Sequence, residues 1–332
     1  MVREQTAANP QRMQRALEGL RRYQEAERAP PLERMPAVAA AEGAILRDYG
    51  GSGAPVLFVP SLINPPTILD LSAERSLLRW FAARGHRVLL LDWGWPGPRR
   101  SEWGIAEHVE RMLLPLLDSL GEPAGLVGYC LGGTMAAAAA ARLAPVRSLA
   151  TIAAPWHFSA YPAESRNRLG RLWSEGGRGA AKALGVLPME VLQSAFWSLD
   201  PERTVAKFEG FAGMAPGSIE AQAFVTLEDW ANDGPPLPGR AAQDLFVEFF
   251  RADAPGRGRW RVAGELMREE RLRLPILNVV STTDRIVPAA TSLRVGERLE
   301  LAQGHVGMVV GSKAREALWQ PLADWLSRTA AK

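Results

Sequence analysis

The stretch LVGYCLGG, residues 126–133, decides the fold expected for this chain. Leu-Val-Gly is typical of the end of a buried strand, and the Gly-Gly-Thr-Met that follows, leading into six alanines, predicts the start of a helix. Cys130 lies at the junction, with Gly128 and Gly132 two residues away on either side. A sharp strand-to-helix turn needs such small neighbours, because the residue at its tip has a strained backbone.

Cys130 is the only cysteine among the 332 residues, and it has two interpretations. A free cysteine is most often an inert residue of the core. A cysteine at a helix N-terminus is different, because the helix dipole favours the thiolate. The pattern Gly-x-Cys-x-Gly at a strand-to-helix turn therefore favours a nucleophile.

Composition and charge limit the class of protein. Hydrophobic residues make up 47% of the chain and charged residues 23%, which is ordinary for a globular domain. The net charge is +3 and the arginines are scattered, so we expect no nucleic-acid-binding surface. A single cysteine excludes an intramolecular disulfide, and the opening MVREQTAANP lacks the apolar segment of a secretory signal. These features predict a cytoplasmic protein.

Two uncharged stretches are long enough to be tested as membrane spans: Tyr49 to Leu69 and Pro123 to Ala141. Glycines and prolines interrupt the first, and the turn at Cys130 interrupts the second. We therefore expect both to be buried core, and no transmembrane segment.

Strand and helix patterns alternate from residue 55 onward. Short apolar runs typical of buried strands are separated by helical patterns, as in PVLFVPSL, SAERSLLRWFAARG, RVLLLDW, GIAEHVERMLLPLLDSLG, LVGYC and SLATIAAP. Such alternation predicts an α/β fold with a mostly parallel sheet covered on both faces.

The alternation stops at Trp156 and resumes at PILNVVSTTD, residues 275–284. The region between is helical and irregular, which is typical of a cap over an active site. We expect four segments, namely a helical arm (1–44), a first part of the core (45–155), a helical cap inserted after the sixth strand (156–272) and a second part of the core (273–332). The helix predicted over residues 11–28 is expected to pack on the main domain rather than to bind a partner or a surface.

A cysteine nucleophile normally works with a histidine that is oriented by a carboxylate. The chain has four histidines: His86, His108, His157 and His305. In doubly wound folds with this nucleophile turn, the acid follows the nucleophile at a strand end and the histidine lies on a later loop. Only His305, in QGHVGM, has that position with an acid ahead of it.

The acid is then Asp284, at the carboxyl end of PILNVVSTTD. A turn or helix-capping aspartate is the alternative for Asp284, and an ordinary loop histidine is the alternative for His305. Because the three residues occur in the required order, each at a strand end, we predict a triad of Cys130, Asp284 and His305.

An oxyanion hole would use two backbone N–H groups. The first belongs to Leu131, directly after the nucleophile, and the second to the loop that follows PVLFVPSLIN. We predict Leu62 for the second, with Ile63 as the near alternative. Four tryptophans are candidates for lining an acyl channel, although packing in the core is the more frequent role of this residue: Trp93, Trp95, Trp156 and Trp230.

Several separate motifs resemble the catalytic domain of polyhydroxyalkanoate synthases. They occur in the same order over roughly residues 45–330: SLINPPTILDLSAERSLLRWFAARGHRVLLLDWGWPGP, LVGYCLGGT, ATIAAPWHF, EDWANDG, LNVVSTTDRIVP and GHVGMVVGSKA. The chain is more similar to the short synthases that work with a second subunit, the class III type, than to the long single-chain ones.

The resemblance implies an α/β-hydrolase fold, a mobile cap, and 3-hydroxyacyl-coenzyme A substrates that are polymerised to a polyester. It implies that Cys130 carries the acyl group, that His305 is the general base, and that Asp284 assists it or the incoming hydroxyl. Coenzyme A enters as part of the substrate, so neither a cofactor nor a metal is implied. The resemblance implies three further features less directly: a homodimer, a second synthase subunit and a place at the polyester granule surface. The reason is that the N-terminal segment is short and the insert is rich in Gly, Ala and Arg.

Other functions remain open from the sequence. GYCLGG also resembles the nucleophile motif of dienelactone hydrolases, but Asp284 follows Cys130 by 154 residues, which leaves room for a cap that such compact enzymes lack. A thioesterase or a polyester depolymerase would use the same triad. A non-catalytic granule scaffold is the alternative from another class, and the intact triad argues against it.

Overall fold

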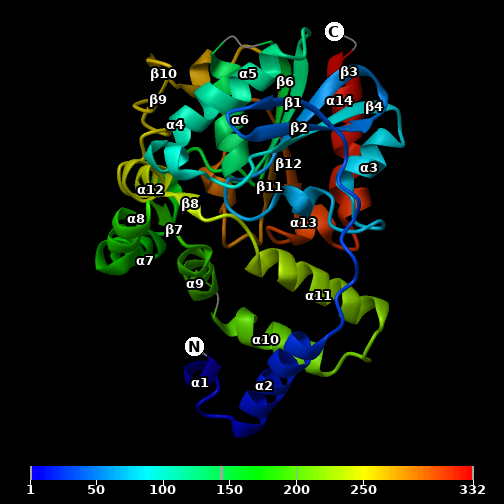
Figure 1. Cartoon of the computed structure of the whole chain (residues 1–332), viewed down its shortest axis with the longest axis vertical. Helices are drawn as coiled ribbons and strands as arrows, with labels where there is room; N and C mark the ends of the chain where they lie inside the picture. Colours follow the sequence, from blue (N-terminus) through cyan, green and yellow to red (C-terminus); the bar gives the residue numbers. More distant parts are fainter. Residues whose placement is uncertain (1, 143–144, 200, 331–332) are drawn as a thin grey trace.

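The computed structural model describes residues 2–142, 145–199 and 201–330, and an eight-stranded sheet organises them (Figure 1). The strand order is β1-β2-β4-β3-β5-β6-β11-β12. The strands are β1 (Ala37–Ala41), β2 (Ala44–Gly50), β3 (Ser52–Val59), β4 (His86–Asp92), β5 (Ala124–Tyr129), β6 (Val146–Ile152), β11 (Ile276–Ser281) and β12 (Glu297–Leu301). All neighbours from β4 to β12 are parallel, whereas β2 is antiparallel to both β1 and β4. The predicted α/β class with a mostly parallel sheet is confirmed.

Helices cover both faces of the sheet, which explains why the central strands are apolar on both sides. Every residue of β5 and of β11 is buried. On one face lie α4 (Ile105–His108), α5 (Leu114–Asp118) and α6 (Leu131–Ala141), and on the other α3 (Leu77–Ala82), α13 (Gly307–Val310) and α14 (Gln320–Ala330). The alanine helix α6 is buried along its whole length, because alanine lets it pack closely against β5 and β6.

The sheet begins at Ala37, ahead of the core boundary expected at residue 45. The hairpin of β1 and β2 turns through Glu42 and Gly43, whose φ angles are 48° and 88°. Positive φ at both central residues of a two-residue loop matches the right-handed twist of the flanking strands. The Glu-Gly pair was the signal for this hairpin, although the run of alanines in β1 carries little strand preference.

Between β6 and β11 the chain is mainly helical. Its helices are α7 (Ala163–Leu172), α8 (Arg178–Leu184), α9 (Met189–Leu199), α10 (Pro201–Ala212), α11 (Ile219–Asn232) and α12 (Gly239–Gln243), and π-helical turns extend α7 and α12. Short strands pair as β7 (Val186–Leu187) with β8 (Leu237–Pro238) and as β9 (Arg261–Val262) with β10 (Glu265–Leu266). The insert after β6 therefore carries two short antiparallel strand pairs besides its helices.

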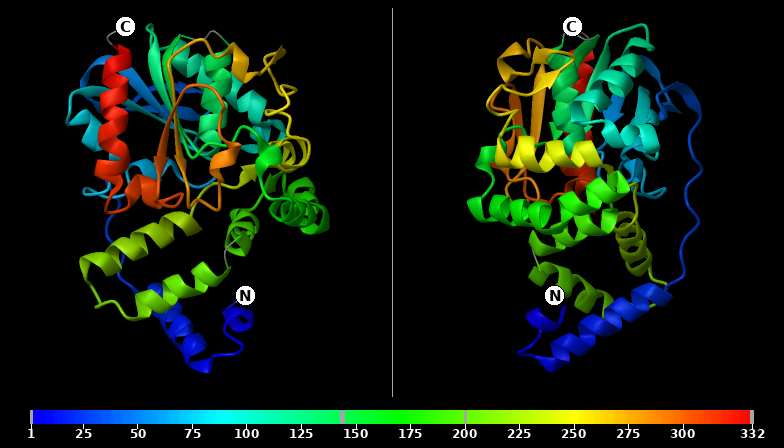
Figure 2. Two further views of the ribbon diagram at one scale, coloured as in Figure 1. Left: turned by 180° about the vertical axis from the view of Figure 1, so that it is seen from behind. Right: turned by 60° about the vertical axis from the view of Figure 1, so that its left-hand side comes forward.

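The N-terminal helices lie at the far end of the insert from the sheet. They are α1 (Val2–Gln5) and α2 (Pro10–Glu25), and α2 packs on α10 (Figures 1 and 2). Asn9 caps α2 by accepting a hydrogen bond from the Arg12 N–H at 3.0 Å. An extended segment then runs along the side of the molecule to the edge strand β1 (Figure 2). The helix predicted over residues 11–28 is thus present but ends at Glu25.

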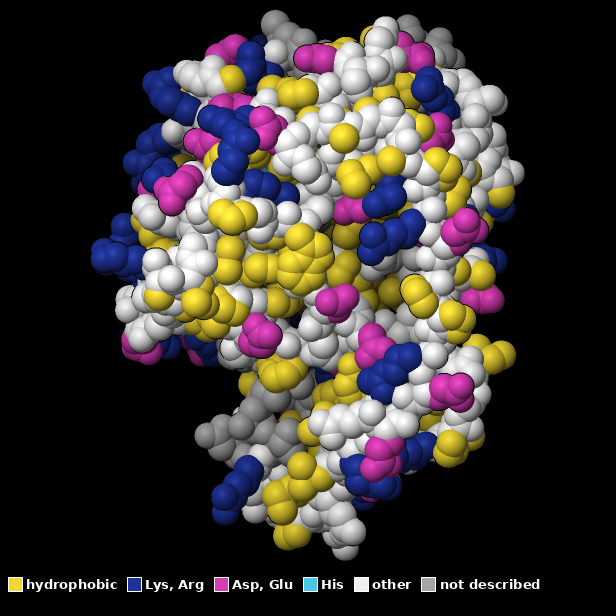
Figure 3. Space-filling model, viewed as in Figure 1, with side chains coloured by type: hydrophobic (Ala, Val, Ile, Leu, Met, Phe, Trp, Pro, Cys, Tyr) yellow, Lys and Arg dark blue, Asp and Glu magenta, His cyan; other side chains and the backbone are white. Residues whose placement is uncertain are grey.

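The helices and the surface charges bear on two expectations from composition, that no segment spans a membrane and that no surface binds nucleic acid. None of the helices in the described ranges is long and apolar enough to span a membrane. On the face seen in Figure 3, Lys and Arg side chains are interspersed with Asp and Glu.

Candidate active site

Cys130 lies at the tip of the turn between β5 and α6, with φ 53° and ψ −129°. A positive φ is costly for a residue with a side chain, and the surroundings maintain it. The Cys130 N–H donates to the Ile152 carbonyl at 2.9 Å. A Cβ added at Gly128 would overlap the backbone of Gly133, so the helix start can lie this close to the strand end only with glycine there.

The structure brings Asp284 and His305 together. Asp284 follows β11, and His305 lies between β12 and α13. The His305 Nδ1 is 2.6 Å from Asp284 Oδ2, and the other carboxylate oxygen accepts hydrogen bonds from the N–H groups of Ile286 at 2.7 Å and Val287 at 3.0 Å. The Asp284 side chain is fully buried. The three predicted residues thus follow three parallel strands, β5, β11 and β12, at the carboxyl edge of the sheet.

Cys130 completes this group, because its side chain lies close enough to His305 to act on the imidazole. Burial alone would lower the pKa of His305, but the charges of Asp284 and Cys130 outweigh it and raise that pKa to about 10. An imidazole in this position holds its proton at neutral pH beside the sulfur. Tyr129 packs under the imidazole with its ring centre 5.1 Å away, and burial raises the pKa of its phenol well above the usual range.

Cys130 borders two cavities. The larger has a volume of about 400 Å³ and lies between the sheet edge and helices α9, α10 and α11. Residues from the insert that line it are Gln193, Trp197, Arg203, Thr204, Lys207, Phe224, Leu227, Glu228, Trp230 and Ala231. The smaller, about 70 Å³, is walled mostly by apolar side chains that include Phe158, Tyr161, Leu192 and Phe246. A nucleophile thus faces one roomy, partly charged space and one narrow, apolar space.

The predicted oxyanion donors belong to the first turn of α6 and to the loop after β3, two segments that come into contact. A Cβ at Gly132 would overlap the carbonyl oxygens of Val59 and Pro60, so this loop touches the first turn of α6. The Ile63 N–H donates to Ser61 Oγ at 3.0 Å. Among the described residues, the N–H groups of Leu62 and Leu131 make no hydrogen bond. The geometry therefore favours Leu62 over Ile63 as the second donor.

The other three histidines lie away from Cys130. His108 is completely buried and faces Trp93 and Trp103. His157 is buried with its Nε2 3.2 Å from a Glu269 carboxylate oxygen, poorly aligned for a hydrogen bond. His86 is half-buried at the start of β4.

Of the four tryptophans, only Trp230 lines the larger cavity. Trp93 and Trp156 are core residues and Trp95 is 69% exposed. Sequence reasoning missed the charged lining of the cavity, Lys207 with Glu228, because a charge in a helical insert is usually on a solvated face.

The strand order and the turn at Cys130 agree with a match along the chain: the family model for the alpha/beta hydrolase fold matches residues 54–306. The chain belongs to the α/β-hydrolase family. Solved members of similar fold include a putative non-heme bromoperoxidase from Mycobacterium tuberculosis, with a TM-score of 0.55 and 16% identity over 90% of this chain and 99% of that one. A meta-cleavage product hydrolase from Pseudomonas fluorescens has a TM-score of 0.52 and 17% identity, again over 90% and 99%. At these identities the likeness concerns the fold alone.

Within the α/β-hydrolases, the resemblance to polyhydroxyalkanoate synthases is confirmed. A poly(3-hydroxyalkanoate) polymerase subunit of Haloferax mediterranei is 28% identical over 82% of this chain. Those of Synechocystis, at 28%, and Thiocystis violacea, at 25%, also match 82% of it. The chain spans 58% of the Haloferax relative's length, but 77% and 80% of the other two.

Proposed function

We propose that this chain is an acyltransferase that polymerises 3-hydroxyacyl groups from coenzyme A into polyhydroxyalkanoate through an acyl-Cys130 intermediate. One observation carries the proposal: Cys130, His305 and Asp284 meet at the sheet edge beside a cavity large enough for an acyl chain. The similarity to polymerase subunits supports this substrate class.

In the first half-reaction, the Cys130 sulfur attacks the thioester carbonyl. The negative charge that develops on the carbonyl oxygen is stabilised by the N–H groups of Leu131 and Leu62. The bond to coenzyme A breaks, and its sulfur takes the proton from His305. Asp284 holds the imidazole in place throughout, through its contact with Nδ1.

In the second half-reaction, the hydroxyl of another hydroxyacyl group attacks the carbonyl of the acyl-cysteine. Its proton passes to His305, an ester bond forms, and the Cys130 thiolate is released. Transfer from coenzyme A to cysteine exchanges one thioester for another, so the acyl group stays activated. A serine ester would be a weaker acyl donor, which gives cysteine an advantage over serine at this position.

Whether the acyl group goes to a hydroxyl or to water depends on how well the cap excludes water. We assign the cap to residues 156–272, because α9, α10 and α11 from this segment cover the cavity at Cys130. Thioesterase or depolymerase activity is the outcome if water reaches the acyl-cysteine first.

The proposal is tested with purified protein and 3-hydroxybutyryl-coenzyme A. Coenzyme A release is followed with time, the product is analysed for polymer, and an acid-quenched digest is searched by mass spectrometry for a thioester on the Cys130 peptide. Polymer together with that label supports the proposal. Release with only free acid indicates a hydrolase, and no release indicates a scaffold.

Substitutions at Cys130 separate the nucleophile from a buried hydrophobe. Cys130→Ala is expected to form no acyl-enzyme and to release no coenzyme A. Cys130→Ser should acylate slowly and transfer poorly, because a hydroxyl has a far higher pKa than a thiol. An active Cys130→Ala variant, or a label on another residue, would refute the assignment.

A second subunit is part of the proposal, since the matching relatives are described as polymerase subunits. A homodimer is the other arrangement considered. Light scattering of the purified chain distinguishes a monomer that needs a partner from a dimer. Fractionation of cells that produce the polyester shows whether the chain lies in the cytoplasm or on polyester granules.

A further inference from the structure

The N-terminal helix α2 is fitted closely to the insert. A Cβ added at Gly19 of α2 would overlap the Phe208 carbonyl of α10, so the two helix backbones are almost in contact. Arg12 donates two hydrogen bonds at 2.9 Å to one oxygen and one to the other of the Glu209 carboxylate, and a guanidinium nitrogen of Arg22 reaches the Met214 carbonyl at 2.7 Å. Only glycine allows two helices to pack at this separation.

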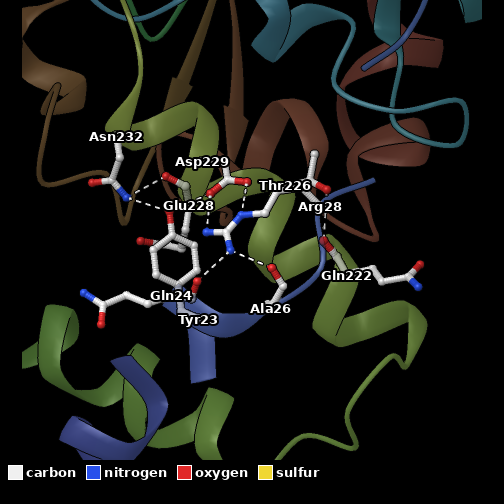
Figure 4. Close-up of polar contacts among 9 residues, drawn as sticks. All are labelled: Tyr23, Gln24, Ala26, Arg28, Gln222, Thr226, Glu228, Asp229 and Asn232. Carbon is white, nitrogen blue, oxygen red and sulfur yellow. Dashed lines mark hydrogen bonds and ion pairs between the residues drawn. The ribbon is translucent and has the colours of Figure 1, made fainter. Parts of the chain in front are cut away.

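A second set of contacts joins the end of α2 to α11 (Figure 4). The Tyr23 hydroxyl donates to Asp229 Oδ1 at 2.7 Å and lies 3.3 Å from the Asn232 amide, which donates to it. Arg28 donates to both oxygens of the same Asp229 carboxylate, each at 3.1 Å. Charge-assisted bonds of this type specify orientation as well as adding stability. Asp229 is therefore held from two positions on the N-terminal segment.

The same helices carry the wall of the Cys130 cavity on their other side. Leu227, Glu228 and Trp230 of α11 line the cavity, as does Lys207 of α10. Lys207 and Glu228 form an ion pair at 2.6 Å that joins the two helices, and the Glu228 side chain is only 8% exposed. Asp229, which α2 holds, directly follows Glu228.

The last turn of α11 is also bonded to the loop that carries the proposed oxyanion donor Leu62. The Asn64 side chain donates to the Ala231 carbonyl at 3.2 Å, and the Trp230 indole donates to the Pro65 carbonyl at 2.9 Å. A continuous set of contacts thus runs from α2 through α11 to the loop after β3.

We propose that α2 and the residues directly after it are a clamp that holds α10 and α11 over Cys130, with Gly19, Tyr23 and Arg28 as its positioning residues. Releasing the clamp lets the two helices move away, widens the way to the sulfur and loosens the loop at Leu62. The inference goes beyond acyl transfer, because it concerns access to Cys130 whatever group the sulfur carries.

The chain provides its own probe, since Cys130 is its only cysteine. Alkylation rates of the folded protein are measured with a small reagent, iodoacetamide, and with a bulky one, fluorescein maleimide. The ratio of the bulky to the small rate reports the width of the opening. Unfolding of the whole chain also exposes the sulfur, so the free energy of unfolding of each variant is measured by urea denaturation. Opening is scored only where the ratio rises more than the unfolded fraction accounts for. The measurement needs no substrate and does not depend on the proposed reaction.

Two matched pairs of variants test the clamp. Gly19→Ala inserts a methyl group between α2 and α10, whereas Gly210→Ala places the same methyl group on α10 where nothing lies within 4 Å. Arg28→Gln removes the positive charge that pairs with Asp229, whereas Arg21→Gln removes an arginine whose ion pairs, to Glu18 and Glu25, stay within α2. Tyr23→Phe is the mildest change and removes one hydroxyl.

Gly19→Ala is expected to raise the ratio by about tenfold, and Tyr23→Phe and Arg28→Gln by a smaller factor. Gly210→Ala and Arg21→Gln should keep the wild-type ratio. If Gly19→Ala does not fold, the ratios measured for Tyr23→Phe and Arg28→Gln test the clamp instead. The clamp is refuted if these variants keep the wild-type ratio, or if both reagents become faster to the same extent.

Discussion

At the residue scale, the site depends on backbone positions as much as on the reacting side chains. Cys130 has its left-handed φ because β5 and α6 fix the turn on both sides. Gly132 lets Val59 and Pro60, just before the loop that carries Leu62, touch the first turn of α6. Replacing a small residue at such a contact alters the site without touching a reacting atom.

Gly132→Ala tests this contact. The added methyl group would overlap the Val59 and Pro60 carbonyls, so we expect the free energy of unfolding to fall by roughly 1–3 kcal/mol. We also expect slower acylation of Cys130, because the two N–H groups are pushed apart. Urea denaturation and the acylation assay measure the two effects.

Gly179→Ala in α8 is the control, since its Cβ would meet nothing within 4 Å. Alanine at an exposed helical glycine is expected to stabilise by up to about 1 kcal/mol. Equal behaviour of the two variants would contradict the role assigned to Gly132.

His305 makes stability depend on pH. Its pKa is raised to about 10 by Asp284 and Cys130 against the effect of burial, whereas an unfolded histidine has a pKa of about 6.5. Between these values the native state keeps a proton that the unfolded state has lost. The stability that His305 contributes is therefore complete below about pH 6.5 and is lost as the pH rises toward about 10.

Asp284→Asn removes the buried charge that raises this pKa. We expect the difference in unfolding free energy between wild type and Asp284→Asn to shrink as the pH rises through this window. Urea denaturation across the window measures the difference, and NMR of the imidazole locates the titration. A difference that stays constant with pH would argue against the His305–Asp284 coupling.

At the element scale, the helix before the nucleophile strand differs from the regular helix that its sequence pattern predicts. The single helix predicted there consists of α4, a π-helical turn over Val109–Leu113, and α5. His108 ends α4 and is completely buried, with its Nδ1 2.6 Å from the Gly104 carbonyl. A neutral imidazole fits this position and a charged one does not.

His108 predicts sensitivity to acid. Burial lowers the pKa of His108 to about 4. The unfolded chain binds a proton there below about pH 6.5 and the native state does not, so stability falls as the pH drops from about 6.5 to about 4. His108→Gln removes this titration while keeping an amide to donate to Gly104. Denaturation curves at several pH values should show that the variant loses less unfolding free energy in acid than the wild type. An equal dependence of the unfolding free energy on pH in the two proteins would contradict the prediction.

At the scale of the whole molecule, buried acidic side chains join the two ends of the insert to each other and to the segment before β12. Asp253 accepts a hydrogen bond from the Phe158 N–H at 2.8 Å, near the start of the insert. Near its end, Glu269 accepts one from the Arg294 N–H at 2.8 Å and lies 3.2 Å from His157. These contacts hold the base of the insert, whereas the α2 clamp holds its far end.

Glu269→Ala is expected to lower the free energy of unfolding by roughly 1–3 kcal/mol, because it removes the acceptor of the Arg294 N–H and the carboxylate that lies beside the buried His157 imidazole. Glu270→Ala, one residue further along and exposed, should have almost no effect. Thermal unfolding of the two variants makes the comparison, and equal melting temperatures would show that the base of the insert does not depend on Glu269.

The sequence by itself determined the α/β class, the turn at Cys130, and the order of Cys130, Asp284 and His305 along the chain. These features are local, because strand and helix periodicity and the glycines around one turn are visible within a few residues. The carboxyl ends of parallel strands must also meet at one edge of the sheet, so the order along the chain was enough to expect Asp284 beside His305.

The tertiary structure alone decided the features that join distant parts of the chain. Tyr23 meets Asp229, and Asn64 meets Ala231, across separations of 206 and 167 residues. No periodicity encodes such pairs, because they depend on the path of the whole insert over the sheet. The cavity at Cys130 is of the same kind: its walls come from segments that are far apart in the sequence, and its volume exists only once they pack.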